Sequence, residues 1–336
     1  MSLALAIDAR FGNKRYESHV SALSVDLGLL PGVNSLTARL PRAVPVDAAP
    51  GDPADLTLDN GEEAALVLTG LTRSVARGLA ETAVTAVDAG AALAAMRPVA
   101  SYTAMSAGDI IRGLAGEAGA DLGRSTLGSE RLESYVTGQG RTGAEHVARL
   151  AGYGGGIALV DADGSLAAIS RPGPPASRAL RYGREILAYC VTDTAPGALA
   201  VPVGAGAAAA GDPRALLPVT EALSGGAPEP DATVRWRPQA ALRSQGAQRA
   251  AAEAADAAHG ASGQRLAATC WLLPALRPGE MIEVQDLPGS IAGGPWLVTH
   301  VQHRIGPMGA TTRLDAVSGE GGGLLAGLLG ALGGLL

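Results

Sequence analysis

Hydrophobic and polar residues alternate with a period of two over much of the chain between residues 19 and 87. Leu23, Val25 and Leu27 alternate with polar neighbours, LPGVNS interrupts the pattern, and SLTARL resumes it. Such alternation is typical of half-buried strands, so residues 19–40 are predicted to form a β-hairpin. Two more strands are expected at AALVLTGLTRS and ETAVTAVD, and the proline-rich PRAVPVDAAPGDPAD predicts a loop. Short strands between turn residues favour a small barrel or sandwich in residues 1–100.

The pattern changes to a helical period near residue 101. In SYTAMSAGDIIRGLAGEAG, Ser106 is expected to cap a helix whose apolar residues share one face, and Gly119 can end it. The residues TGAE predict a capping box from Thr142 to Glu145 at the start of a second helix. IALVDADGSLAAIS then predicts a hairpin with Asp163-Gly164 as its two-residue turn. Residues 101–178 are therefore expected to form a small helix-and-hairpin α+β domain.

Strand patterns return in the last part of the chain. RPGPPASRALRYG predicts a linker, whereas REILAYCVTD, GALAVPVGA and TVRWR predict strands, with an exposed loop between the last two. An alanine-rich helix is expected over residues 241–259, ended by Gly260. Strands with Pro-Gly and Gly-Gly turns follow from LAATCWLL to TTRLDAVSG. Residues 179–318 are therefore predicted to form a second β-barrel that carries the helix.

The predicted fold class is mainly β with α+β insertions. It comprises two tube-like antiparallel β-barrel domains and a small helix-hairpin domain, followed by a hydrophobic Gly/Leu tail at residues 319–336. A chain of 336 residues needs neither disulfide nor metal to fold. The formal net charge of -6 argues against a general phosphate-binding surface. The aromatic share of 3% disfavours stacking platforms for single-stranded nucleic acid or carbohydrate.

The cysteines and the N-terminus indicate the compartment. Cys190 and Cys270 lie in apolar stretches, as small buried side chains do in a reducing compartment, and a disulfide between them is the less favoured alternative. The first residues have no basic start followed by an apolar core, so we expect no secretory signal and synthesis in the cytoplasm. No stretch reaches the ~18 to 20 consecutive apolar residues that span a bilayer.

The strongest sign of a ligand site is the sequence GxGxxG from Gly138 to Gly143. It stands between a short strand and a helix, as in the dinucleotide-binding fingerprint, and Asp161 lies near the position of a ribose-binding acid. However, the preceding SERLESYVT is polar, unlike a buried parallel strand. The strand ending at Val160 also turns directly into another strand, where a parallel array needs a crossover helix. A helix entered through a Gly-rich turn is the preferred interpretation, and a dinucleotide-binding enzyme is the alternative.

Other chemistry-bearing residues do not form a recognisable site. His300 and His303 are three apart on an expected strand, so their side chains point to opposite faces and cannot share a metal. His19, His146 and His259 lack neighbouring ligands. The acidic clusters Glu62-Glu63 and Asp161/Asp163 fit turns better than a calcium loop or carboxylate pair. No nucleophile motif or phosphate loop is present, so we expect no enzyme and no catalytic, cofactor-binding or metal-binding residues.

The C-terminal segment GGGLLAGLLGALGGLL would be an aggregation hazard if it were exposed to water. We expect it to pack against a second copy or a neighbouring protein. A membrane-active segment is the alternative, although it is short for a single spanning helix. The candidate partner-binding residues are its leucines: Leu324, Leu325, Leu328, Leu329, Leu332, Leu335 and Leu336.

The order of these elements resembles the phage late control protein D family, which includes contractile-tail baseplate hubs and the N-terminal part of VgrG spike proteins. The strongest likeness is the unit from Glu133 to Ile169, with its polar strand, its helix ending in RLAGYG and its hairpin turning on Asp-Gly. A second is Pro278-Gly279 followed by IEVQ and the strand from Trp296 to Arg304. The likeness covers residues 15–318. The low aromatic content and the leucine-rich tail are not part of the family pattern.

This resemblance implies a structural protein of a virion tail baseplate or an assembled injection particle. It implies a homotrimer in which each chain contributes two tube-like barrels to a pseudo-sixfold ring between a sixfold tail tube and a threefold spike. The expected partners are a tail tube or tube-adaptor protein, a separate spike protein and baseplate wedge proteins. DNA would be non-specific passing cargo, and the acidic net charge is compatible with a lumen that repels DNA and lets it slide through. A membrane would be met only at infection or injection.

Overall fold

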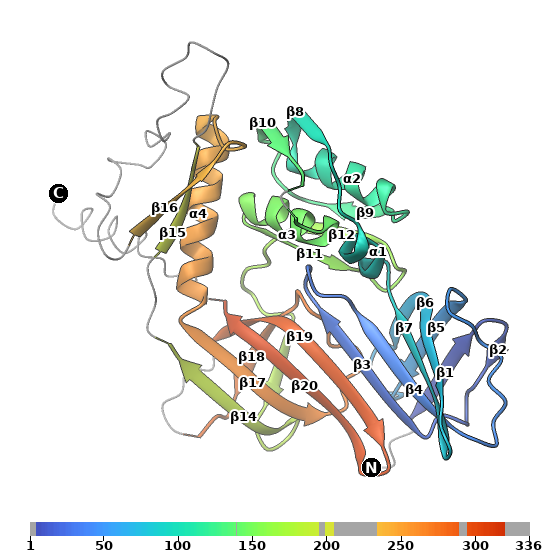
Figure 1. Ribbon diagram of the computed structural model, residues 1–336. Helices are drawn as coiled ribbons and strands as arrows, with labels where there is room; N and C mark the ends of the chain where they lie inside the picture. The colour runs from blue at the N-terminus through green and yellow to red at the C-terminus, as the bar shows by residue number, and fades with distance from the viewer. Residues whose placement is uncertain (1–4, 139, 195–198, 205–233, 289–293, 320–336) are drawn as a thin grey trace.

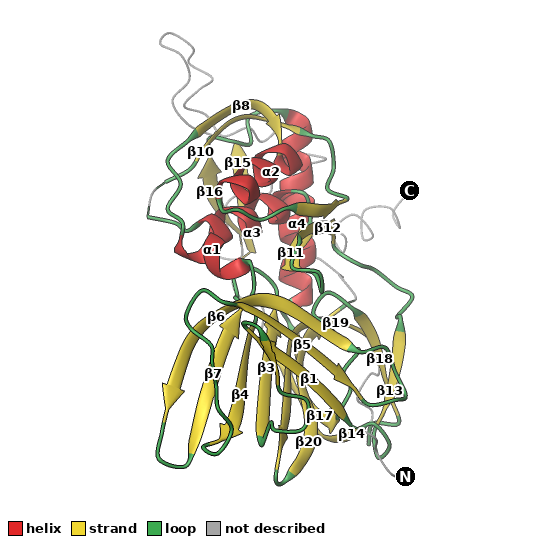
Figure 2. Ribbon diagram, turned by 90° about the vertical axis from the view of Figure 1, so that its right-hand side faces the viewer, coloured by secondary structure: helices red, strands yellow, loops and turns green. Residues whose placement is uncertain are grey.

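The computed structural model describes residues 5–138, 140–194, 199–204, 234–288 and 294–319 (Figure 1). A large β-sheet forms one part of the molecule, and most of the helices lie together above it (Figures 1 and 2). Each part has its own hydrophobic core. The mainly β fold class with a small α+β part is therefore confirmed.

The first half of the sheet is antiparallel, with the order β3-β4-β7-β6-β5-β1-β2. Its strands are β1 (Ala6–Phe11), β2 (Lys14–Arg15), β3 (Ala22–Gly28), β4 (Ser35–Pro41), β5 (Pro53–Asp59), β6 (Leu66–Arg77) and β7 (Glu81–Val87). The expected β3–β4 hairpin is confirmed, and alternate residues of both strands are buried. The expected loop is shorter than predicted because Pro53 begins β5. Proline is tolerated at the first residue of a strand, and ADLTLD behind it buries alternate residues.

The second half has the order β14-β17-β20-β19, with β18 between β19 and β13. Its strands are β13 (Arg178–Arg181), β14 (Ile186–Asp193), β17 (Gln264–Trp271), β18 (Met281–Gln285), β19 (Pro295–Gly306) and β20 (Gly309–Ser318). An isolated bridge from Tyr182 to Ile186 connects the end of β13 to the start of β14 without forming a ladder between them. The predicted linker at residues 171–183 is therefore only partly a linker, since β13 pairs with β18.

The two halves are one continuous sheet because β19 pairs with β3. His300 lies opposite Gly28 and Ile305 lies opposite Leu23 in this antiparallel ladder. The buried side chains of both halves belong to one core made mainly of Leu, Val, Ile and Ala. Their shared ladder fixes the register between two segments that lie far apart in the sequence.

The α+β part follows the sequence predictions closely. Its elements are α1 (Gly90–Ala95), β8 (Ser101–Ser106), α2 (Ala107–Glu117), β9 (Leu122–Ser125), β10 (Arg131–Val136), α3 (Gly143–Tyr153), β11 (Gly156–Val160) and β12 (Leu166–Ser170). Ser106 caps α2, and the capping box between Thr142 and Glu145 opens α3, as predicted. Each cap satisfies amide groups that a helix start leaves without partners.

The β11–β12 hairpin is confirmed, but its turn is longer than predicted. Asp161 N donates to Ser165 O, so three residues lie inside the turn. Gly164 has a φ of +82°, which explains why glycine stands there. The local Asp-Gly signal located the turn but did not determine its length.

The alanine-rich helix α4 (Gln245–Ala261) starts after Ser244 and contains Gly260, so the predicted range 241–259 and its end are both shifted. It packs on β15 (Leu199–Gly204), which pairs in parallel with β16 (Val234–Gln239). Tyr153 Oη on α3 donates to Gln239 Oε1 at 3.1 Å. The helix therefore lies against the α+β core and not inside the second half of the sheet.

Candidate functional site

The six central strands present one polar face to solvent. Along β17, β20, β19, β3, β4 and β7, alternate residues enter the core, and the residues between them stay outside. The charged side chains on this face are Arg39, Arg265, Arg304, Arg313, Asp26, Glu81 and Asp315. Most of the other side chains there are small, such as Ser, Thr and Ala. The result is a polar surface with a nearly balanced charge.

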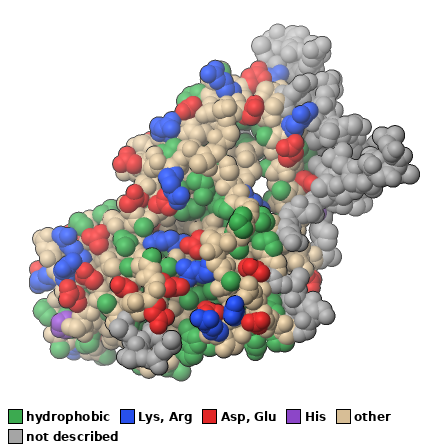
Figure 3. All heavy atoms as spheres, turned by 180° about the vertical axis from the view of Figure 1, so that it is seen from behind, with side chains coloured by type: hydrophobic (Ala, Val, Ile, Leu, Met, Phe, Trp, Pro, Cys, Tyr) green, Lys and Arg blue, Asp and Glu red, His purple; other side chains and the backbone are tan. Residues whose placement is uncertain are grey.

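Cross-strand contacts pair several of these charges. Arg39 on β4 forms an ion pair with Glu81 on β7. Gln302 Nε2 on β19 donates to Asp26 Oδ1 on β3 at 2.6 Å. Charges of both signs also intermingle on the back of the molecule (Figure 3). The negative net charge is therefore not concentrated on the central face of the sheet.

Both ends of the sheet carry strands that are incompletely paired within the described residues. β14 pairs with β17 along one side, and its other side makes only the bridge at Ile186. At the opposite end, β1 pairs fully with β5 but meets β2 only at Arg10 and Phe11. Such edges present backbone donors and acceptors that another strand can pair with.

An apolar patch lies beside the β14 edge. Trp271 is 55% exposed, Leu187 41% and Tyr182 38%. Trp271 N donates to Glu185 O, which holds the end of β17 against the start of β14. In a chain with few aromatic residues, an exposed tryptophan next to an open edge marks a surface suited to protein contact.

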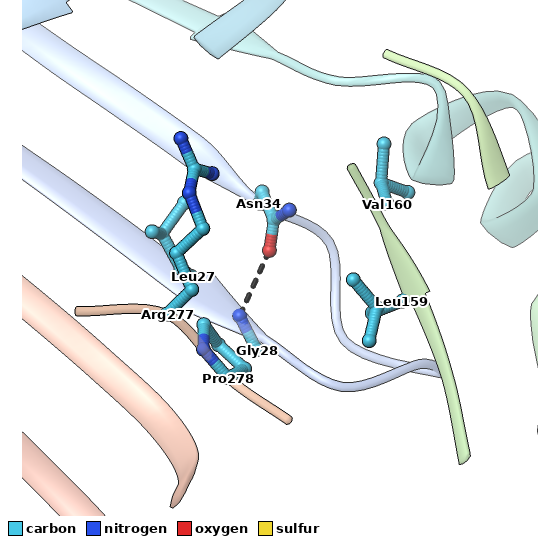
Figure 4. Close-up of a pocket in the computed structure, with 7 residues that line it drawn as sticks. All are labelled: Leu27, Gly28, Asn34, Leu159, Val160, Arg277 and Pro278. Carbon is cyan, nitrogen blue, oxygen red and sulfur yellow. Dashed lines mark hydrogen bonds between the residues drawn. The ribbon is translucent and has the colours of Figure 1, made fainter. Parts of the chain in front are cut away.

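The sheet and the α+β part meet at a three-way junction (Figure 4). Leu27, Gly28 and Asn34 come from the first half, Leu159 and Val160 from β11, and Arg277 and Pro278 from the second half. Asn34 Oδ1 accepts a hydrogen bond from Gly28 N at 2.8 Å. The cavity left between them is about 10 Å³, room for about one water molecule. The three segments are therefore closely packed at this cavity.

Charged residues surround this junction on its second-half side. Arg277 Nη2 donates to Val67 O at 2.9 Å, and burial lowers the pKa of its guanidinium. Arg178 forms an ion pair with Glu63 at 2.6 Å. Burial raises the pKa of the nearby Glu280 carboxyl, and the charge of Arg178 partly offsets this. These contacts connect the β5–β6 turn to the second half of the sheet.

The structure places the GxGxxG segment at the entry to α3. β10, the strand before it, pairs antiparallel with β8 and not within a parallel sheet. Buried His146 accepts a hydrogen bond from Gly138 N at 3.2 Å through Nε2, and its Nδ1 lies 2.7 Å from Tyr135 Oη. Asp161 instead forms an ion pair with Arg124 at 2.6 Å. The described residues thus lack the strand context that a dinucleotide fingerprint requires.

The two histidines of β19 have different surroundings. His303 is fully buried, and its Nδ1 lies 2.9 Å from Thr312 Oγ1. His300 is half-buried, with Nδ1 3.4 Å from Asp315 Oδ2 and Nε2 3.8 Å from Asp26 Oδ1. The prediction that they occupy opposite faces is confirmed. Burial lowers the pKa of His303 to about 4, so its imidazole is neutral at pH 7.

The remaining expected site residues also take part in local structure. Asp163 Oδ1 accepts from Ser165 N at 2.9 Å, and the Asn60 side chain accepts from the amides of Glu62 and Glu63. Across the described ranges, no three His, Cys, Asp or Glu side chains gather as metal ligands. No helix in those ranges is long and apolar enough to cross a membrane.

Cys270 is buried as expected, but the expectation for Cys190 was wrong. Both thiols are free, and Cys190 is exposed on β14. Its partner across the ladder is Ala267, whereas Cys270 pairs with Ile186. An apolar neighbourhood in the sequence does not distinguish the two faces of a strand at the end of a sheet. The leucines of residues 324–336, expected to bind a partner, lie outside the described residues.

Sequence reasoning missed the exposed Trp271 patch and buried Asp88. Trp271 follows the buried Cys270 in an apolar run, so only the period-two alternation could have placed it outside. Asp88 is 5% exposed and directly precedes the short helix α1. Nothing in the local pattern distinguishes it from an ordinary turn aspartate.

Comparison with solved structures finds the same fold in tail proteins. No family model matches the sequence, and no curated protein matches it. The tail protein from Neisseria meningitidis MC58 is similar over 94% of this chain and 96% of its own, at 16% identity and a TM-score of 0.70. The 43 kDa tail protein of prophage MuSo2 from Shewanella oneidensis covers 95% and 98%, at 15% identity and a TM-score of 0.66.

A third similar structure comes from a secretion machine. It is an E. coli component of the type VI secretion system that is described as structurally similar to T4 bacteriophage tail proteins. The likeness covers 89% of this chain and 73% of that one, at 14% identity and a TM-score of 0.60. The sequence thus adopts the fold of phage tail proteins and of a related secretion-system component over nearly all of its length.

Proposed function

We propose that this chain is a non-enzymatic structural hub of a contractile phage tail or phage-like injection machine. In this proposal three copies form a pseudo-sixfold ring that joins a sixfold tail tube to a threefold spike. The observation that carries the proposal is the single sheet made of two halves joined by β3 and β19, which has a polar face and an open edge at each end. The similar tail proteins support it through their fold.

The two halves supply the repeated unit that such a ring needs. Residues 1–100 and 179–318 are proposed to act as two tube-like modules, and three chains would then present six. Head-to-tail contact between unlike edges closes into a ring when the rotation between copies allows it. Pairing β14 of one copy with the β1–β2 end of the next would satisfy the open edges.

The remaining partners are proposed by the same reasoning. A tail tube or tube-adaptor protein would stack on one side of the ring, and a separate spike protein would occupy the other. The leucines between Leu324 and Leu336 are proposed to bind a neighbouring baseplate protein or a second copy. DNA would pass without specific contact, because the charges on the central sheet face are balanced and partly paired.

Negative-stain electron microscopy of the purified protein tests the ring. The expected images are rings with a threefold axis and a central opening. Trp271→Ser should reduce the fraction of rings if the patch beside β14 is buried between copies. Val99→Ser is the matched control, since Val99 is 90% exposed in the α+β part. Compact single particles from unmodified protein at micromolar concentration would reject the proposal.

A further inference from the structure

Asp88 is a buried carboxylate at the point where the sheet gives way to the α+β part, and it has no ion-pair partner among the residues that the structure describes. It follows β7 directly and precedes α1. It is 5% exposed, Oδ1 accepts from Gly90 N at 2.9 Å, and Oδ2 is buried without a hydrogen bond of ordinary geometry, although the Asn34 side chain nearby partly offsets the rise of the carboxyl's pKa. Buried carboxylates are normally paired or fully hydrogen-bonded. A half-satisfied one is costly while it carries its charge.

Asp88 also belongs to the contacts that join the two cores. Asp88 N donates to Asn34 O, and the Asn34 side chain holds the end of β3 through Gly28. In the same turn, Leu30 N donates to Ala158 O on β11 at 2.8 Å. A short network therefore connects the first half of the sheet to the α+β part.

The packing around this network is tight. A Cβ on Gly90 would lie 2.9 Å from Asp88 Oδ1 and 3.6 Å from side-chain atoms of both Leu30 and Val160. On the β6 side, a Cβ on Gly70 would lie 3.1 Å from the Asp88 Cα. Little room exists for the carboxylate to move toward solvent, so its charge must be accommodated in place.

Among the described residues, no cation forms an ion pair with Asp88. Two uncharged residues face it: Asn34 from the β3–β4 turn and Gly90 from α1. Charged side chains on the neighbouring elements make other contacts or face a groove. Arg277 lines the junction cavity with Asn34 and donates to Val67 O, and Asp161 after β11 pairs with Arg124. Arg73 of β6 lines a groove together with Val87 and Ala91.

We infer that Asp88 makes the junction between the sheet and the α+β part proton-responsive, so that protonation of this one carboxyl tightens the connection. Burial raises its pKa from 3.8 to about 6, which places the change at mildly acidic pH. An aspartate whose folded pKa is raised destabilises the folded state at neutral pH. That free-energy penalty begins to fall as the pH drops through about 6, the folded pKa, and is gone near pH 3.8, the pKa of the unfolded chain.

The test compares melting temperatures of Asp88→Asn and unmodified protein between pH 7.5 and 5. Asparagine lacks the charge, so the variant should melt higher at pH 7.5, and the difference should shrink steadily toward pH 5. Other titrating groups are the same in both proteins, so their effect cancels when the two melting temperatures are subtracted at each pH. Asp88→Ala provides an independent variant, because the pH dependence of its difference comes from Asp88 alone even if the variant is less stable at every pH.

Asp121→Asn is the matched control, since Asp121 is exposed and outside the junction. Its difference from unmodified protein should stay constant over the same range. Hydrogen exchange, corrected for intrinsic rates, then locates the effect. Protection in residues 29–34 and 88–96 should rise by about tenfold or more on acidification, as a shift of one pKa unit or more implies. Melting differences that do not change with pH for both Asp88 variants would overturn the inference.

Discussion

The two halves of the sheet share one ladder but have different interiors. The first half is filled mainly by aliphatic side chains, with one aromatic contact between Phe11 and Tyr16 at 5.9 Å between ring centroids. Both halves bury polar atoms without a hydrogen-bond partner: Asp8 Oδ1, Glu63 Oε2 and Thr72 Oγ1 in the first, Trp296 Nε1 and His303 Nε2 in the second. Burial raises the pKa of Asp88 at the end of the first half and lowers the pKa of His303 in the second. Acid should therefore relieve a penalty at the first half and add one in the second.

The largest expected effect tests whether the halves unfold together. Leu36→Ala in the first half and Leu314→Ala in the second each empty a fully buried site. Each should lower the free energy of unfolding by about 3 to 4 kcal/mol. Because β3 and β19 pair directly, urea unfolding of each variant should remain a single transition. A second transition in either variant would show that the halves are independent.

A somewhat smaller effect separates the halves by pH. Burial lowers the pKa of His303 from 6.5 to about 4, so the unfolded chain binds a proton before the folded one does. Stability is fully present above pH 6.5 and should fall by about 2 to 3 kcal/mol as the pH drops toward 4.

His303→Gln should flatten this pH dependence, measured as the difference in urea midpoint between pH 7 and pH 5. His300→Gln is the matched control, because His300 is on the same strand but its side chain is 41% exposed on the opposite face. Equal slopes for unmodified protein and His303→Gln would contradict the assigned role of burial.

An effect near 1 kcal/mol should stay within the α+β part. Thr142→Ala removes the hydroxyl that accepts from Glu145 N at 3.1 Å at the start of α3. Loss of such a cap typically costs about 1 kcal/mol. Hydrogen exchange should increase in α3 and leave β3 and β19 unchanged. Thr142→Ser, which retains the hydroxyl, should restore the protection.

The smallest effect concerns the polar face of the sheet. Arg39→Ala breaks the exposed ion pair with Glu81 and should change stability by less than about 0.5 kcal/mol. The Arg39–Glu81 pair matters more for the balance of charge on the central face of the sheet. Glu81→Gln should strengthen salt-dependent DNA binding by the assembled protein, measured by fluorescence anisotropy at low ionic strength. A large stability loss in Arg39→Ala would mean that this face is a structural contact.

The sequence predicted those features that depend on neighbouring residues. Ser106 and Thr142 were located as caps because a cap needs only a hydroxyl and an amide three residues later. β3, β4 and β7 were found because their alternation is regular. β5 was missed because Pro53 made its start look like part of the loop, and β13 was missed because its partner, β18, lies about 100 residues away.

The same limit applies to the sites. Whether Asp88 is buried depends on Asn34 and β11, which no local pattern connects to it. Cys190 faces outward because it alternates with Tyr189 and Val191, which pack against the core, and this register is fixed by pairing with β17. The GxGxxG segment shows the opposite error, a local pattern that suggested a site. The spacing matches a dinucleotide-binding motif, but the strand before it pairs antiparallel with β8 and not within a parallel sheet.

Light scattering coupled to size-exclusion chromatography tests the central claim of a threefold ring most directly. The expected mass is that of three 33.4 kDa chains, about 100 kDa, stable on dilution through the low micromolar range. Leu187→Asp beside the β14 edge should shift the population toward single chains. A mass of one or two chains for the unmodified protein at every concentration would contradict the account.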